Sequence, residues 1–214
     1  MQISLINPYV VKILIALRPE DSINAVAKRI NLSYGWTYRW VRELMGAGAV
    51  KELNKKIVPQ ENNRFYKDTI AYVKRTFAGD VGFYYSVLGL FGITYCFTKT
   101  DAVFVWTKGG YNIGRSKEHY PFFIKVKQDD RILFEYYCKK LGLRINERKG
   151  VFYSVEFVED IKLELCAGVP VEPLDTTIEF MKKYIYNFQP ALEMVGEMYG
   201  KKMGVKYKEV SMYA

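Results

Sequence analysis

The chain is poor in the residues that most often hold metals or form disulfides. Among its 214 residues there is one histidine, His119, and three cysteines, which are Cys96, Cys138 and Cys166. A single histidine excludes a histidine cluster, and the isolated cysteines match neither a zinc site nor a disulfide framework. We therefore expect no metal site, no cofactor and a reducing compartment, the cytoplasm.

Long apolar runs are also missing. No run reaches the roughly 18 residues that a membrane-spanning helix needs. The longest, residues 81–97, contains Gly, Ser and Thr and is typical of a buried core. Residues 1–17 lack the basic leader and the small-residue cleavage site of a signal peptide. We expect a cytoplasmic protein with no membrane partner.

Positive charge is present in excess and is unevenly placed. The formal net charge is +9. Residues 1–80 carry 13 Lys and Arg against 7 Asp and Glu, or +6, and the rest of the chain carries 19 against 16, or +3. This asymmetry indicates a polyanionic partner for the N-terminal part. A solvated basic surface is the alternative that charge alone leaves open.

Apolar periodicity predicts three helices near the N-terminus. Asn7-Pro8 begins the first helix, which residues 18–21 end. Ser22 caps a second helix over residues 23–30, and Asn31-Leu32 forms a tight turn. Ser33 caps a third helix that continues to about Met45.

A hairpin and a fourth helix are expected next. Residues 49–53 and 56–59 alternate as two short strands around the turn Asn54-Lys55. Residues 64–77 then repeat apolar side chains at helical spacing, and Gly79 ends the segment. We interpret residues 63–79 as a linking or dimerisation helix.

One stretch resembles a known DNA-binding motif. It consists of Ala27-Lys-Arg-Ile30-Asn-Leu32-Ser33, Thr37, Val41, Arg42-Glu43-Leu44 and Ala47-Gly48-Ala49-Val50. Over about 24 residues without a gap it resembles the winged helix-turn-helix of bacterial and archaeal transcription regulators, closest to the MarR and ArsR style. Thr37 departs from the usual aliphatic residue. The resemblance implies a winged helix-turn-helix domain over residues 1–62 and a homodimer.

The third helix would enter the major groove of duplex DNA. With Thr37, Trp40, Val41 and Leu44 toward the core, its other face is free for contact. The candidate DNA-binding residues are Ser33, Tyr34, Gly35, Tyr38, Arg39 and Arg42 on the helix, and Lys55 and Lys56 at the tip of the wing. Trp36 either joins this face or packs against the first helix. Winged helices also contact proteins or RNA, so these partners stay open.

The remainder, residues 80–214, has a mixed pattern. Helices are predicted over residues 81–91, 129–141 and from 171 onward, with Pro173 and Pro190 at helix starts. Strands are predicted over residues 93–98, 102–107, 122–126, 143–146, 151–158 and 161–165. Because strands and helices do not alternate strictly, we predict an α+β fold, with a mixed α/β C-terminal effector or oligomerisation domain.

A second, shorter resemblance lies in this domain. Gly109-Gly110, Arg115-Ser116, residues 122–126 and residues 169–174 are similar to the core of nucleotidyltransferase-fold proteins of the abortive-infection type, over roughly 100 residues. That chemistry needs two carboxylates on the strand after the Gly pair, to hold two metal ions. Residues 118–122 supply a lone Glu118, and Glu164 alone cannot hold two metals. We expect a degenerate relative without catalytic residues.

Residues 108–115 are basic and rich in glycine. Lys108, Gly109, Gly110 and Arg115 form a candidate anion-binding site, although the segment lacks the Gly-Lys-Ser/Thr end of a P-loop. A simple turn is the alternative. Such a site would accept a small-molecule or nucleotide effector.

Together these features predict a protein that binds double-stranded DNA sequence-specifically. We expect a transcription regulator that reads the major groove with the helix over residues 33–46. The alternative is a DNA-acting or nucleotidyltransferase-type enzyme that its winged helix directs to DNA. An intact carboxylate pair would favour the enzyme, and the sequence does not contain one.

Overall fold

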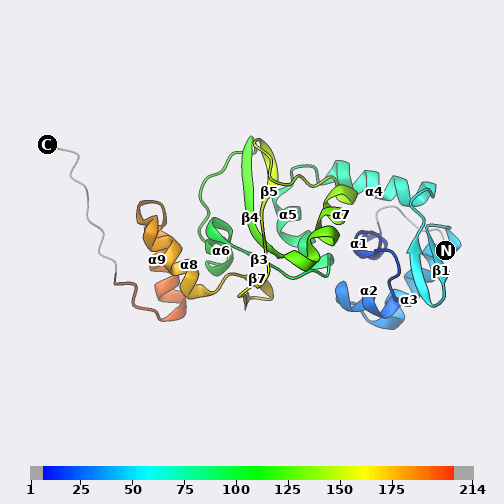
Figure 1. Ribbon diagram of the computed structural model, residues 1–214, viewed down its shortest axis with the longest axis horizontal. Helices are drawn as coiled ribbons and strands as arrows, with labels where there is room; N and C mark the ends of the chain where they lie inside the picture. The colour runs from blue at the N-terminus through cyan, green and yellow to red at the C-terminus, as the bar shows by residue number, and fades with distance from the viewer. Residues whose placement is uncertain (1–6, 205–214) are drawn as a thin grey trace.

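The computed structural model describes residues 7–204 and shows a mixed α/β protein with a two-stranded and a five-stranded sheet. The molecule is elongated (Figure 1). Helices α1 to α3 and the small sheet occupy one end, the large sheet lies in the middle, and helices α8 and α9 lie at the other end (Figure 1). No helix in residues 7–204 combines the length and the apolar character that crossing a membrane requires.

The three N-terminal helices begin at the predicted caps. They are α1 (Pro8–Ala16), α2 (Ile23–Arg29) and α3 (Tyr34–Gly46). The side-chain oxygens of Asn7, Ser22 and Ser33 each accept hydrogen bonds from backbone N–H groups in the first turn of the helix that follows. These local signals fix where the helices start, and the helices bury their apolar faces in a shared core.

The small sheet is a hairpin of β1 (Val50–Leu53) and β2 (Lys56–Pro59). Asn54 and Lys55 at its turn have φ of 50° and 62°. Positive φ at both central residues is the geometry of the tight turn that matches strand twist. Ile57 of β2 also donates a backbone hydrogen bond of 2.7 Å to Asp21, so the segment between α1 and α2 pairs with the hairpin.

Asp21 is the buried centre of this N-terminal unit. Arg29 donates hydrogen bonds of 2.7 and 2.8 Å to its two carboxylate oxygens and a third of 2.7 Å to the carbonyl of Ala16. Bidentate pairing of this kind satisfies both buried charges. One ion pair therefore joins the end of α1, α2 and the hairpin, whereas the sequence of residues 18–21 predicts only the end of a helix.

The large sheet has the strand order β5-β4-β3-β7-β6. Its strands are β3 (Tyr95–Phe97), β4 (His119–Lys127), β5 (Gly150–Val158), β6 (Glu164–Cys166) and β7 (Val169–Val171). The pairs β4–β5 and β3–β7 are parallel, and β3–β4 and β6–β7 are antiparallel. The sheet is thus mixed, in agreement with the predicted lack of strict alternation.

Helices and aromatic rings pack around this sheet. The helices are α4 (Arg64–Thr76), α5 (Val81–Val87), α6 (Lys99–Trp106), α7 (Arg131–Leu141), α8 (Leu174–Lys183) and α9 (Ile185–Tyr199). Phe122 of β4 lies 5.1 Å from Tyr84 of α5 and 5.9 Å from Tyr153 of β5, between ring centroids. Phe134 of α7 lies 5.8 Å from Tyr153. Much of the aromatic excess therefore fills a core.

Two predicted strands of this region are wrong. Residues 102–107 lie in helix α6, which buries Ala102, Val103 and Trp106. The periodicity of a short apolar run does not distinguish a buried strand from a buried helix. The β-branched valines in this run favoured the strand prediction, which is wrong. Residues 143–146 form no strand and contribute only an isolated bridge between Ile145 and Tyr153.

Three element boundaries also differ from the prediction. Of residues 161–165 only Glu164 and Leu165 belong to a strand, β6. Val171 ends β7 and does not begin a helix, because it pairs with Phe97 and Glu164. Pro173 does stand at the start of α8, but Pro190 lies inside α9. A proline costs a helix one N–H donor and does not always end it.

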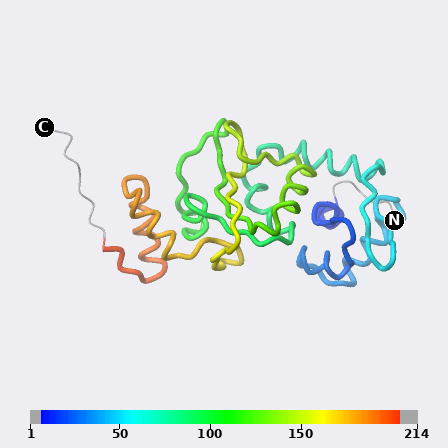
Figure 2. The backbone as a smooth tube through the Cα atoms, viewed as in Figure 1, coloured from blue at the N-terminus to red at the C-terminus, as the bar shows by residue number. Residues whose placement is uncertain are grey.

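Helix α4 links the two cores. Tyr66 and Ile70 belong to the N-terminal core, and Val73 belongs to the core around the large sheet. Figure 2 shows α4 running from the hairpin to the central part of the molecule. Apolar side chains of α4 are thus buried in both cores within the chain.

Helix α7 caps the end of α1. The hydroxyl of Tyr137 donates to the carbonyl of Ala16, and the amine of Lys140 donates to the carbonyls of Ile15 at 3.1 Å and Leu17 at 2.7 Å. The last carbonyls of a helix have no partner within it. Side chains of the central part thus supply these partners and hold the N-terminal unit in place.

Because Lys140 is buried in this contact, we expect the free energy of unfolding of the protein to rise with pH. Burial lowers the pKa of Lys140 to about 7, although Glu61 and Asp21 act to raise it. Between pH 7 and the ordinary lysine value of about 10.4 the unfolded chain binds a proton that the folded protein lacks, so raising the pH favours folding. The slope is at most about 1.4 kcal/mol per pH unit, and it vanishes below pH 7, where both states are protonated.

We expect Lys140→Met to lack this slope. Urea denaturation of the parent and of Lys140→Met from pH 7 to pH 8.5 gives the free energy of unfolding of each protein. The difference between the two values cancels the contributions of the other titrating groups, which both proteins share. Lys139→Met, on the exposed side of the same helix, is the matched control and should follow the parent protein. Parallel curves for parent and Lys140→Met would show that Lys140 is charged in the folded protein.

Candidate nucleic-acid interface

Helix α3 divides into a buried and an exposed side. Thr37, Trp40, Val41 and Leu44 are buried, as predicted. The hydroxyl of Thr37 donates a hydrogen bond of 3.0 Å to the carbonyl of Ser33. Because that bond satisfies its only donor, the threonine is tolerated in the buried side of the helix. The periodicity of the sequence was sufficient to assign this side of the helix.

The exposed side carries the predicted contact residues. Tyr34 and Tyr38 are 54% and 44% exposed and stack with ring centroids 6.0 Å apart. Gly35 faces open space, since a Cβ built on it meets no atom within 4 Å. The hydroxyl oxygen of Ser33 accepts from the N–H of Trp36 at 3.3 Å, so its own proton is left for an outside acceptor.

Trp36 has both of the roles that the sequence left open. It packs edge-on against Tyr9 of α1 at 5.5 Å between centroids, and it is still 37% exposed. The guanidinium of Arg39 lies 5.3 Å from the Trp36 ring and 6.0 Å from Trp40. This cation–π arrangement holds Arg39 on the exposed side of α3. The contribution of Tyr9 was missed, although it stands at the start of a predicted helix.

Exposed basic side chains lie on α3 and at the hairpin turn. Arg42 lies on the exposed side of α3, and Lys55 and Lys56 are exposed at the hairpin turn. In the part of the chain that the structure describes, none of these three forms an ion pair with a carboxylate. Unpaired cations beside exposed aromatic rings form a surface suited to a polyanion.

The four residues predicted to bind an anion do not converge. Arg115 is buried and donates hydrogen bonds of 3.2 and 3.1 Å to the carboxylate of Asp101. Lys108 and Gly109 instead border a mostly apolar cavity of about 450 Å³. At Gly110 a Cβ would fall 2.4 Å from the terminal methyl of Met194. A buried guanidinium needs its carboxylate partner. Arg115 therefore stays paired with Asp101 in the core and does not bind an anion together with residues 108–110.

The carboxylates considered for catalysis also lie apart. Glu118 is exposed just before β4, and Glu164 accepts a backbone hydrogen bond of 3.3 Å from Leu174. Within residues 7–204 no group of three or more His, Cys, Asp and Glu side chains is placed to hold a metal ion. The inactivity of this domain stays a prediction from the sequence.

Comparison of the chain with protein-family models, with curated proteins and with solved structures yields no match. The resemblances to winged helix-turn-helix regulators and to nucleotidyltransferase-fold proteins therefore stay predictions. The surface formed by α3 and the hairpin turn carries the functional proposal.

Proposed function

We propose that residues 7–62 are a winged helix-turn-helix that binds duplex DNA and that the protein is a transcription regulator. The observation that carries this proposal is the exposed side of α3, with two stacked tyrosines and two arginines, beside a hairpin whose turn holds Lys55 and Lys56. Helix, turn, helix and hairpin follow one another in the order of this motif.

The dimensions of α3 suit a major groove. Its 13 residues make a helix about 20 Å long, and the groove of B-DNA is about 12 Å wide and admits one helix. Tyr34 and Tyr38 lie near its N-terminal end, where recognition helices contact base edges. Arg39 and Arg42 follow on the same exposed side, and a guanidinium pairs with guanine through two hydrogen bonds.

Selection from a pool of random duplexes tests the proposal directly. We expect the protein to enrich a defined sequence, and a homodimer, which the family resemblance implies, would enrich inverted repeats. Affinity for the enriched duplex should fall steeply with salt, because phosphate contacts release counterions. A pool that shows no enrichment, with equal affinity for single-stranded DNA or RNA, would overturn sequence-specific duplex binding.

The hairpin turn makes a separate prediction. Lys55→Gln/Lys56→Gln should weaken binding to all duplexes alike and reduce the slope of log affinity against log salt by about two units, roughly 0.9 for each lost phosphate contact. Fluorescence anisotropy at a series of salt concentrations measures the slope. Lys182→Gln/Lys183→Gln, the same charge change at the opposite end of the molecule (Figure 1), should leave it unchanged. An unaltered slope in the hairpin variant would remove the wing from the interface.

A further inference from the structure

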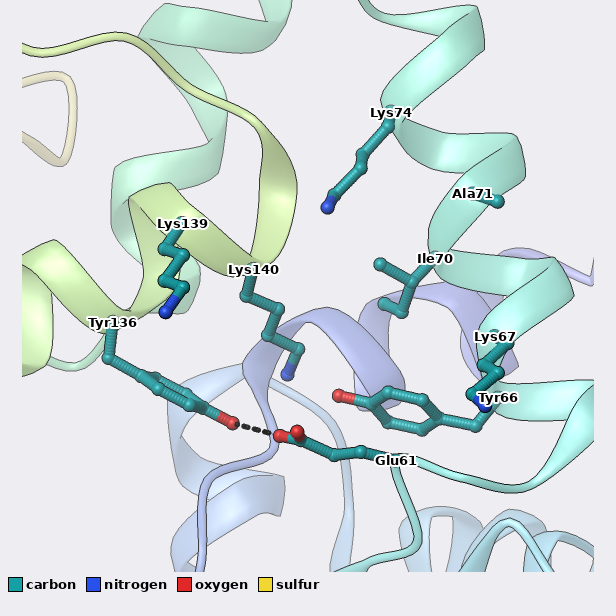
Figure 3. A pocket seen from close by; sticks show the side chains of 9 residues that line it. All are labelled: Glu61, Tyr66, Lys67, Ile70, Ala71, Lys74, Tyr136, Lys139 and Lys140. Carbon is teal, nitrogen blue, oxygen red and sulfur yellow. Dashed lines mark hydrogen bonds between the residues drawn. The ribbon is translucent and has the colours of Figure 1, made fainter.

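A cavity of about 430 Å³ lies where α4, α7 and the loop after β2 meet. It is lined by Glu61, Tyr66, Lys67, Ile70, Ala71, Lys74, Tyr136, Lys139 and Lys140. Figure 3 shows Lys74 from α4 and Lys140 from α7 extending into the space between the two helices. This volume is within the range of small-molecule sites.

The charge of the lining is strongly positive. Besides Lys140, whose pKa burial lowers to about 7, three lysines face one carboxylate, that of Glu61, which already accepts a hydrogen bond of 3.2 Å from Tyr136. Lys67, Lys74 and Lys139 form no ion pair in the region that the structure describes. Like charges gathered around one cavity repel each other, and an anion between them relieves that repulsion.

A second observation points to a ligand at the same place. The hydroxyl of Tyr66 is buried and has no hydrogen-bond partner, and the residue is only 4% exposed. Figure 3 shows this hydroxyl directed into the space between α4 and α7. An unpaired buried hydroxyl costs free energy unless something completes its bond. An oxyanion in the cavity would accept its proton.

The remaining walls are apolar. Ile70 and Ala71 line the α4 side, and the rings of Tyr66 and Tyr136 lie across the cavity from one another. The amine of Lys140 already donates to the carbonyls of Ile15 and Leu17, which leaves the other three lysines for a ligand. A cationic rim beside an apolar wall selects a compact anion attached to an apolar group.

We propose that this cavity binds a small phosphorylated molecule with an aromatic or apolar portion. A phosphate monoester carries about two negative charges at neutral pH and three strong acceptor oxygens, which matches three lysines and one tyrosine hydroxyl. The site joins α4 and α7, the two helices that connect the N-terminal unit to the sheet. Binding needs no DNA, so the proposal stands independently of the proposed function.

Isothermal titration calorimetry of the whole protein without DNA tests this site with phenyl phosphate as the probe. We expect saturable binding that is tighter than that of inorganic phosphate, while phenol, which has the ring without the charge, does not bind. Lys67→Gln/Lys74→Gln/Lys139→Gln should lower the affinity about tenfold or more. Lys149→Gln/Lys162→Gln/Lys182→Gln removes the same charge from exposed positions outside the cavity and should bind like the parent.

Tyr66→Phe separates a ligand site from a merely basic surface. The variant keeps the ring and removes only the unpaired hydroxyl, so without ligand its melting temperature should equal or exceed that of the parent. Its affinity for phenyl phosphate should nevertheless fall about fivefold. The proposal would be overturned if Tyr66→Phe and the cavity triple variant both bound phenyl phosphate as tightly as the parent. It would also be overturned if the parent did not bind phenyl phosphate at millimolar concentration.

One further outcome contradicts the site. The cavity lysines could serve the DNA backbone instead of a small molecule. In that case the triple variant would bind duplex DNA less tightly and with a smaller salt slope, while phenyl phosphate would not bind to the parent. Loss of phosphate binding with unchanged DNA binding distinguishes this site from the interface on α3.

Discussion

Replacing Arg39 and Arg42 together should abolish the preference of the protein for its selected duplex. Each arginine that pairs with a guanine edge contributes about 1–3 kcal/mol of discrimination, and about 1.4 kcal/mol corresponds to a tenfold change in affinity. We therefore expect Arg39→Ala/Arg42→Ala to bind the selected duplex and a scrambled one equally. Competition between labelled selected and unlabelled scrambled duplex measures the ratio.

The lysine variant sharpens this test. Arg39 also packs over Trp36 and Trp40, so an alanine removes a packing contact as well as a charge. Arg39→Lys/Arg42→Lys keeps both charges but cannot form the planar, two-bond contact with guanine. It should lose the sequence preference and keep its salt-dependent binding to any duplex. Retention of the preference in both double variants would show that other residues read the bases.

A control variant tests whether the loss of positive charge alone explains the result. Arg131 and Arg148 are exposed and lie in the part of the chain built around the large sheet. Arg131→Ala/Arg148→Ala removes the same net charge as the α3 variant, and the preference for the selected duplex should be unchanged. A similar loss in this control would mean that net charge, and not the side chains on α3, governs affinity.

The N-terminal elements were predictable because their signals are local. Asn7, Ser22 and Ser33 each cap the next helix by accepting hydrogen bonds from N–H groups no more than three residues away. Asn54 and Lys55 adopt the positive φ that the hairpin turn needs. The helical spacing of apolar residues assigned the buried side of α3. None of these inferences needed knowledge of what lies far along the chain.

The region around the large sheet was harder because its decisive contacts are distant in sequence. Residues 102–107 were predicted as a strand, yet they lie in α6, and Trp106 donates a hydrogen bond of 2.9 Å to the carbonyl of Glu172, the residue that follows β7. The cavity between α4 and α7 brings Tyr66 close to Lys140, and no local pattern connects the two. Lys67 and Lys74 lie in a segment that the sequence predicts as a helix, but its periodicity does not indicate a site there.

Arg115 shows the same limit in the candidate site. It stands in a basic, glycine-rich segment, a pattern that favours anion binding, yet its partner is Asp101, 14 residues earlier. Asp101 has no exposed surface and also accepts hydrogen bonds from the backbone of Phe123 at 2.8 Å and from the hydroxyl of Tyr85. The pair is therefore built into the fold beside β4, where only the tertiary structure reveals it.

Breaking this pair should be strongly destabilising. Asp101→Ala leaves the guanidinium of Arg115 buried without its counter-charge, and removal of one partner of a buried ion pair costs about 3–5 kcal/mol. We expect a loss of that size in the free energy of unfolding, measured by urea denaturation monitored through tryptophan fluorescence. A loss below about 1 kcal/mol would mean that water or a rearranged side chain replaces the carboxylate, as at an exposed pair.

The double variant decides whether the pair is structural or Arg115 belongs to an anion site. In Asp101→Leu/Arg115→Met both charges are gone and apolar groups fill their space, so the protein should recover much of the stability that Asp101→Ala loses. If residues 108–115 instead bind an anion through Arg115, releasing the arginine in Asp101→Ala should create affinity for inorganic phosphate that the double variant lacks. We expect no such gain, because Arg115 also donates a hydrogen bond of 2.6 Å to the carbonyl of Pro121 and lies 4.1 Å from the centroid of the Tyr120 ring. These contacts direct the guanidinium toward β4 even when the carboxylate is absent.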